Sequence, residues 1–248
     1  MSGQGTGSMT NEIAEARRDL AAILRWSWRL GLSEGICNHY SFAIDAGSFL
    51  VNPFGYHWSE LKASQMLLVD YEGRVLEGEG TVESTAMFIH SRIHRALPQA
   101  RCVLHTHMPY ATALASLERG RVEMASQNAL RFFADIAYDD DYQGLALDTA
   151  EGDRICRSAG DKRVLFLANH GVIVVGRSIA SAFDDLYYLE RTCEVQVIAQ
   201  STHRPLKIVN HETCRKTREQ FVADDSYAQA HLKSIRRILD RECPDYAQ

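Results

Sequence analysis

The chain has 248 residues, 46% of them hydrophobic, and its 27 basic and 32 acidic residues give a formal net charge of −5. A chain of this size can bury a substantial core, and its acidic balance without a long basic run argues against nucleic acid as a partner. Because it holds no apolar run long enough to span a bilayer and no signal-peptide pattern, we expect a cytoplasmic protein with no membrane partner.

Punctuation and hydrophobic periodicity divide the first half of the chain into short elements. Residues 1–10, rich in Gly and Ser, are expected to be a disordered lead or a remnant of cloning, followed by a single domain over residues 11–248. Thr10 or Asn11 is placed to cap a first helix that ends at Gly31. Strands are then predicted at residues 41–44, 49–51 and 67–70, and a helix at residues 84–96.

The second half continues this alternation without a linker or an internal repeat. Strands are predicted near residues 102–104, 121–124, 136–138, 164–168 and 171–176. Helices are predicted at residues 109–117 and 149–158 and in a long amphipathic stretch that begins at Ser178. Elements that alternate irregularly in this way indicate one α/β domain built around a mixed sheet.

Three histidines follow apolar runs. His105 and His107 stand at the end of the run 102–104, and two residues at i and i+2 on a strand point to the same face, so their ring nitrogens can meet at one metal ion. His170 lies at a break between two further apolar runs. A third ligand from another strand end would complete a three-histidine site with an open position, whereas an exposed histidine pair on an edge strand is the alternative for the first two.

The order and spacing of several short motifs resemble those of the class II aldolase/adducin family, over roughly residues 12–200 and in wording closest to its adducin-like branch with bacterial aldolase- or decarboxylase-type members. The motifs are G-L-S-E-G at 31–35, N-H at 38–39, N-P-F-G at 52–55, W-S-E-L at 58–61, I-H-S at 89–91, R-A-L-P at 95–98, C-V-L-H-T-H at 102–107 and N-H-G at 169–171. The resemblance implies a class II aldolase-like three-layer α/β fold, with a central mixed or antiparallel sheet flanked by helices. It also implies a homotetramer with active sites at subunit interfaces, and His105, His107 and His170 as ligands of a divalent metal, Zn²⁺ first and Mn²⁺ or Fe²⁺ as alternatives.

The sequence departs from the family at the proton-transferring base. Aldolases of the family carry a glutamate on the helix before the metal-binding strand, and that position falls on Ala86, which cannot move a proton. Glu83, three residues earlier, is the candidate replacement. A solvated glutamate in the first turn, favoured there by the helix dipole, is the alternative.

The residues that grip phosphate in these aldolases are also altered. Asn38, His39, Phe54 and Gly55 occupy such positions, and hydroxyl groups remain only at Ser84 and Thr85, so we do not expect a phosphorylated substrate. The tyrosine that a neighbouring subunit supplies in the aldolases falls at Ser126 or Gln127. The candidate substrate-binding residues are therefore Asn38, Ser84, Thr85 and Gln127.

A metal held by three histidines can polarise a carbonyl and stabilise the resulting carbanion. Retro-aldol cleavage also needs a base, whereas decarboxylation needs only a proton for the carbanion. The sequence therefore predicts a metal-dependent carbon–carbon lyase, of decarboxylase or aldolase type, acting on a small hydroxy- or keto-carboxylate or a hydroxy-aromatic carboxylate. The candidate catalytic residues are His39, Arg131, Tyr142 and Glu83.

Each candidate has a specific role and an alternative. Arg131 is predicted to grip a substrate carboxylate, or else to pair with an acidic residue at a subunit interface. His39 and Tyr142 are candidate proton donors, although Tyr142 can also be a simple turn aromatic. Four aromatic residues would form a flat apolar wall for a ring or belong to the core: Phe54, Trp58, Phe132 and Phe133.

Two other functions fit the same histidines. A three-histidine iron site can activate dioxygen, which would make the protein a non-haem iron oxygenase. A protein that retains no metal would instead be a non-catalytic, adducin-like assembly module. Zinc would exclude the oxygenase, and iron with oxygen uptake would exclude the lyase.

Overall fold

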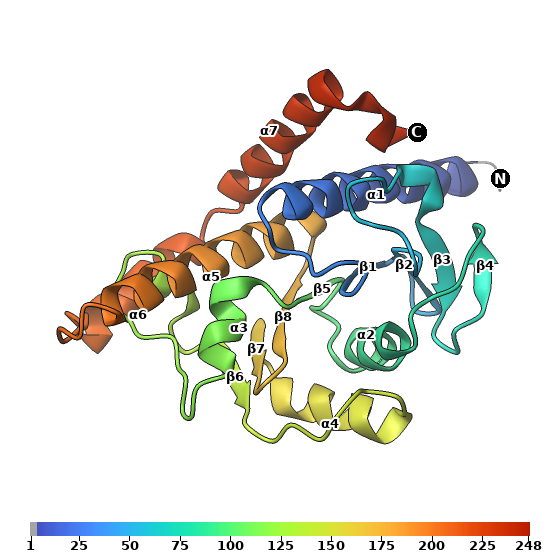
Figure 1. Cartoon of the computed structure of the whole chain (residues 1–248). Coiled ribbons are helices and arrows are strands. Elements are labelled where there is room, and N and C mark those ends of the chain that lie inside the picture. The colour runs from blue at the N-terminus through green and yellow to red at the C-terminus, as the bar shows by residue number, and fades with distance from the viewer. Residues whose placement is uncertain (1–3) are drawn as a thin grey trace.

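A mixed sheet of eight strands organises the chain, in the order β4-β3-β2-β1-β5-β8-β7-β6 (Figure 1). The computed structural model describes residues 4–248, with side chains from Thr10 onward, and the sheet is counted within that range. Neighbouring strands are antiparallel except β6 and β7, which are parallel. The strands are β1 His39–Ala43, β2 Ser48–Val51, β3 Leu67–Asp70, β4 Val75–Glu77, β5 Cys102–Thr106, β6 Ile136–Asp139, β7 Val164–Leu167 and β8 Gly171–Gly176.

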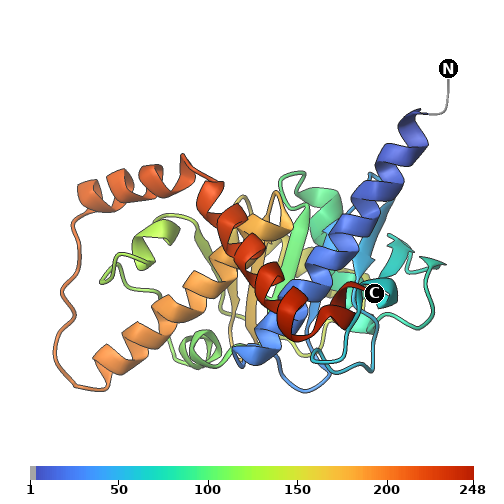
Figure 2. The same ribbon diagram turned by 90° about the horizontal axis from the view of Figure 1, so that it is seen from above.

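Helices cover both faces of this sheet. Helices α2 and α4 pack against one face, α1, α3 and α5 pack against the other, and α7 crosses the outside of α1 and α5 (Figures 1 and 2). The predicted three-layer α/β fold with a mixed central sheet is confirmed. The helices are α1 Gln4–Arg29, α2 Ser84–Ala96, α3 Pro109–Ala115, α4 Thr149–Ala159, α5 Ile179–Gln200, α6 His211–Val222 and α7 Ser226–Glu242, with 3-10 turns η1 Ala63–Gln65, η2 Ala129–Phe132 and η3 Pro244–Ala247.

Alternation along the strands decides which side chains lie beneath α2. In β5, Leu104 belongs to the core under α1 and α5, whereas Val103 belongs to the core under α2 and α4. Because successive side chains on a strand point to opposite faces, His105 lies on the α2 side with Val103. In β1, Tyr40 packs in the core under α1, so its neighbours His39 and Ser41 lie on the α2 side. Polar side chains of two adjacent strands thus meet under one helix.

Two predictions of secondary structure are wrong for reasons that the structure shows. Helix α1 begins at Gln4 rather than at Thr10 or Asn11, so part of the expected lead is helical, and residues 1–3 lie outside the described range. Glycine and serine are weak helix formers, which is why the sequence favoured a later start. Residues 121–124 form no strand, because side chains take their backbone donors: Val122 N donates to Tyr138 Oη (3.0 Å).

Within the described residues, no helix combines the length and the apolar character that crossing a bilayer requires.

Candidate metal centre

Three histidines converge where β5 ends and β8 begins. His105 lies on β5, His107 follows the strand by one residue, and His170 lies in the turn between β7 and β8. Because β5 and β8 pair antiparallel, with Thr106 opposite Val172, that turn comes to lie beside the end of β5. The available ligand atoms of the three rings all lie within 4.8 Å of one another. The structure therefore brings together the three predicted metal ligands.

Two backbone features allow this approach. Asn169 has a positive φ of 56°, a left-handed conformation that asparagine tolerates better than most residues, and this turns the chain sharply before His170. Gly171 comes so close to β5 that a Cβ there would lie 2.7 Å from Thr106 O and 2.8 Å from Cδ2 of His107. The N-H-G sequence thus has a steric reason, since only a residue without a side chain fits after His170.

The ring nitrogens are oriented as a metal site requires. Nδ1 of His105 donates to the carbonyl oxygen of Val172 (3.0 Å), which leaves its Nε2 unprotonated and free to bind. Nδ1 of His107 lies 2.5 Å from a carboxylate oxygen of Glu34. Nε2 of His107 is buried and has no hydrogen-bond partner among the described residues. Imidazoles held on their outer nitrogen by a carbonyl or a carboxylate are the usual arrangement around a protein-bound metal, so these residues fit a divalent ion.

Burial keeps His105 and His170 uncharged near neutral pH. Burial, and then the neighbouring His107, lowers the pKa of His170 to about 4. Burial likewise lowers the pKa of His105 well below its ordinary value, with His170 adding to the effect. Neutral imidazoles keep the lone pairs that a metal ion needs, so the site is ready to bind at neutral pH.

The loop before β1 supports His107 and supplies a free donor. Asn38, at a positive φ of 77°, accepts hydrogen bonds through Oδ1 from the backbone N–H of Glu34 (3.2 Å) and of His107 (3.4 Å). Its Nδ2 is buried and has no partner among the described residues. A buried amide donor of this kind is what the substrate-binding role predicted for Asn38 requires. Sequence reasoning missed Glu34, although an acidic residue in the G-L-S-E-G motif was a usable signal.

A second group of candidates gathers beside the triad. The ring of His39 stacks on that of His105, with centroids 4.9 Å apart. Glu83 is the N-cap of α2, where its carboxylate accepts from Ala86 N (3.0 Å) and from the hydroxyl of Thr85. The same carboxylate lies 3.7 Å from Nε2 of His39. Ala86 is buried and has no carboxyl group, so the carboxyl group at the start of α2 is that of Glu83. Ser84, at the first position of α2, is exposed.

Tyr142 lies at the rim of the triad. It belongs to the loop after β6, its side chain is about half exposed, and its ring centroid is 6.3 Å from that of His170. Of the four candidate catalytic residues, Tyr142 and His39 therefore lie against rings of the triad, and Glu83 lies beside His39.

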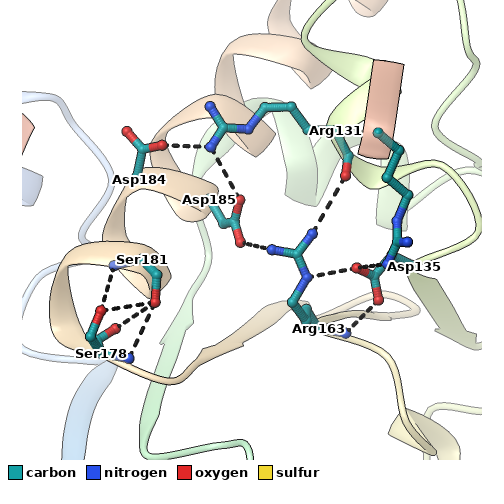
Figure 3. Close-up of polar contacts among 8 residues, drawn as sticks. Arg131, Asp135, Arg163, Ser178, Ser181, Asp184 and Asp185 are labelled. Atoms are coloured by element: carbon teal, nitrogen blue, oxygen red, sulfur yellow. Dashed lines mark hydrogen bonds and ion pairs between the residues drawn. The ribbon is translucent and has the colours of Figure 1, made fainter. Parts of the chain in front are cut away.

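Arg131 is not brought to the triad within this chain. Its Nη2 donates to Asp184 (2.5 Å) and lies 3.4 Å from Asp185, and Arg163 bonds Asp185 in turn (Figure 3). Arg163 precedes β7, whereas His170 follows that strand, so the two groups lie toward opposite ends of it. Arg131 is thus paired with acidic residues, as its alternative had it, but these residues belong to its own chain and not to a subunit interface.

The other residues predicted to line the substrate site also lie away from the triad. Gln127 is exposed just before η2, in the same segment as Arg131. Trp58 and Phe132 are fully buried in the main core, because Trp58 packs on Tyr40 and Phe132 lies on the inner side of η2. Within one chain they do not line the site, and Phe54 is exposed.

Comparisons with known proteins show the family and the fold of the chain. The sequence profile of the "Class II Aldolase and Adducin N-terminal domain" matches residues 18–197, a range that includes all three histidines. A Caulobacter vibrioides protein described as of aldolase class 2 is 33% identical over 246 residues, which cover 97% of this chain and 95% of that protein. The crystal structure of an aldolase II superfamily protein from Pseudomonas syringae superposes with a TM-score of 0.87 at 31% identity, over 95% of this chain and 96% of that one.

Two further relatives have specific names. Decarboxylase NovR of Streptomyces niveus is 29% identical over 227 residues, which cover 89% of this chain and 84% of that protein. A protein of Streptomyces roseochromogenus subsp. oscitans, named 4-hydroxy-3-prenylphenylpyruvate oxygenase/4-hydroxy-3-prenylbenzoate synthase, is 30% identical over 228 residues, 89% of this chain and 82% of that protein.

Proposed function

The chain belongs to the class II aldolase and adducin family, and on that premise we propose that it is a metal-dependent carbon–carbon lyase that decarboxylates a small, unphosphorylated carboxylate bearing a hydroxy or keto group. Retro-aldol cleavage of such a compound is the other carbon–carbon lyase reaction that we assign to this site as an alternative. The observation that carries the proposal is an assembled histidine triad beside a helix that has Ala86 at the position of the aldolase base.

The residues that would hold the metal are His105, His107 and His170, with Zn²⁺ favoured over Mn²⁺ and Fe²⁺. When bound, a divalent ion there supplies Lewis-acid polarisation of a carbonyl or hydroxyl oxygen. The buried, unpartnered Nε2 of His107 supports this assignment, because an uncompensated buried polar atom is costly unless a ligand satisfies it.

The remaining residues suit decarboxylation better than aldol cleavage. Loss of carbon dioxide leaves the bonding electron pair on the substrate carbon, which then needs a proton, whereas aldol cleavage first needs a base for the hydroxyl proton. Tyr142 at the rim carries a phenol hydroxyl that can deliver a proton. The carboxyl group of Glu83, which accepts a hydrogen bond from Thr85, is a second group beside His39 that can exchange a proton. The free Nδ2 of Asn38 would bind a substrate oxygen. The name of the Streptomyces niveus relative points the same way.

The test begins with metal content, because that result does not depend on knowing the substrate. Protein purified without chelator is expected to hold about one Zn²⁺ or Mn²⁺ per chain, and His107→Ala to have lost it. Both proteins are then given salicylate, 4-hydroxybenzoate, 4-hydroxyphenylpyruvate and a sugar phosphate, while carbon dioxide release and oxygen uptake are recorded. Carbon dioxide release from a carboxylate without oxygen uptake is expected. Cleavage of the sugar phosphate alone would contradict the proposal, and absence of metal from both proteins would favour an assembly module.

A non-haem iron oxygenase is the second candidate. It is supported by the ligand set, which consists of imidazoles, and by the name of the Streptomyces roseochromogenus relative. Iron in the purified protein, with oxygen consumed in proportion to product, would establish it in place of the lyase.

A further inference from the structure

A continuous chain of hydrogen bonds runs beneath α2 to His39. His94 Nδ1 lies 2.7 Å from the carbonyl oxygen of Ala100, and its Nε2 lies 2.7 Å from Ser41 Oγ. Ser41 Oγ also lies 2.5 Å from Nδ1 of His90, whose Nε2 lies 2.7 Å from Nδ1 of His39. All five residues are buried, so neither water nor a second set of partners competes for these contacts.

The carbonyl at one end sets the direction of every hydrogen in the chain. A carbonyl oxygen only accepts, so His94 carries its hydrogen on Nδ1 and, when neutral, has a bare Nε2. Ser41 then donates to His94 and accepts from Nδ1 of His90. His90 in turn has a bare Nε2, which accepts the hydrogen on Nδ1 of His39.

The two anchoring rings, His94 and His90, are neutral because they are buried. Burial lowers the pKa of His94 to about 4 and that of His90 well below its ordinary value. A neutral ring has a single ring hydrogen, so each ring has one tautomer that satisfies its partners on both sides.

At the end of the chain, Nε2 of His39 is left without a donor. Its neighbours are Thr85 Oγ1 at 3.3 Å and a carboxylate oxygen of Glu83 at 3.7 Å. The hydroxyl hydrogen of Thr85 is already donated to Glu83. Without the hydrogen bonds that run from His94 to His90, a neutral His39 ring would be more stable with its hydrogen on Nε2, donated toward these oxygens. The series of hydrogen bonds therefore holds His39 in the tautomer that its nearest oxygens disfavour.

We propose that His94, Ser41 and His90 are positioning residues that hold His39 in the Nδ1–H tautomer, so that its Nε2 accepts a hydrogen bond from the hydroxyl group of the substrate. This inference rests on the proposed function for the nature of the substrate. It changes the role predicted for His39, because a ring with a bare Nε2 is an acceptor in the resting protein and not a proton donor. Its stacking on His105 places that acceptor beside the triad.

Nitrogen-15 solid-state NMR of histidine-labelled protein reads the tautomers directly, with no substrate present. In the wild-type protein, the signals of His39, His90 and His94 are expected to be those of the Nδ1–H form. Ser41→Ala removes the link between His94 and His90, and His39 is expected to convert to the Nε2–H form. His94→Ala breaks the chain at its anchored end and is expected to do the same, so that damage confined to one position cannot produce the result. Ser91→Ala, at a buried serine of α2 outside the chain, is the matched control and should change nothing.

Binding of salicylate and of benzoate to the metal-loaded proteins then tests the acceptor role. These ligands differ only by a hydroxyl group, and one lost hydrogen bond is worth about a fivefold to tenfold change in affinity. The preference for salicylate is expected to fall by that factor in Ser41→Ala and to persist in Ser91→Ala.

The results of the NMR and binding experiments can be told apart from a failure of the proposed lyase activity. An Nε2–H signal for His39 in the wild-type protein would overturn the tautomer assignment whatever the enzyme does. An unchanged preference for salicylate in Ser41→Ala would overturn the acceptor role. Failure of all carboxylates to release carbon dioxide would contradict the lyase alone, and would leave the NMR result standing.

Discussion

Replacing Gly171 by alanine should weaken metal binding, because the added methyl group would enter space that belongs to β5 and His107. The new Cβ would lie 2.8 Å from Cδ2 of His107 and 2.7 Å from the backbone oxygen of Thr106. Carbon atoms in contact are about 3.5 Å apart, so the His107 ring or its strand must move by about 0.7 Å. Metal–ligand distances tolerate only about 0.2 Å. We therefore expect affinity to fall by about 10- to 100-fold, as it does when the support of a ligand is lost, and stability to fall by about 1–3 kcal/mol.

Competition for Zn²⁺ with a chromophoric chelator measures the affinity, and urea denaturation of the metal-free protein measures the stability. Gly47→Ala is the matched control, because a Cβ there would contact only Asp45 Oδ1 at 3.6 Å, in the turn between β1 and β2. If folded Gly171→Ala binds Zn²⁺ as tightly as the wild-type protein, the steric reasoning and the placement of His107 in the metal site are both wrong.

Four further outcomes are expected. Glu34→Gln keeps the size of the side chain but loses the charge facing His107, and should weaken Zn²⁺ binding by about tenfold in the same competition. Arg131→Met removes the guanidinium that donates to Asp184, which keeps, among the described residues, only its contact with Nδ1 of His231 at 2.8 Å, and should cost about 1.5–3 kcal/mol in urea denaturation while the metal content is unchanged; an unchanged midpoint would contradict the structural role. Burial lowers the pKa of His94 to about 4, below its value in the unfolded chain, so the unfolded state takes up the proton first as the pH falls. Stability should therefore be lost between about pH 6.5 and 4, by up to about 3 kcal/mol from this group, and His94→Ala should show a shallower dependence. Light scattering should give a particle four times the 27.9 kDa chain, and a monomer would contradict the expected homotetramer.

The histidine triad was predictable because local spacing carries most of its geometry. Alternation along a strand places His105 and His107 on one face, and the apolar runs around His170 locate it at a strand end. Helix α2, at Ser84–Ala96, begins and ends as predicted, because Glu83 can cap it and Pro98 follows it closely. These features depend on neighbours a few residues apart, which a sequence displays directly.

The roles of the surrounding side chains were less predictable, because each depends on a partner distant in the chain. Arg131 has the chemistry to bind a carboxylate, and the folded chain supplies Asp184 and Asp185, more than fifty residues away, as the carboxylates. Glu83 lies within reach of His39 only because β1 passes under the start of α2.

The sequence by itself thus determined an α/β domain and the helices and strands that bear the site, since hydrophobic periodicity and strand alternation are local properties. Its resemblance to the family identified the three-layer fold and the three histidines as ligands. Only the tertiary structure decided what those histidines face. The carbonyl of Ala100, which sets the hydrogen positions as far as His39, and the carboxylate of Glu34, which orients His107, act through contacts made after the sheet and α2 have packed together. Hydrogen bonds are directional and short, so their partners follow from the packed structure and not from the order of residues along the chain.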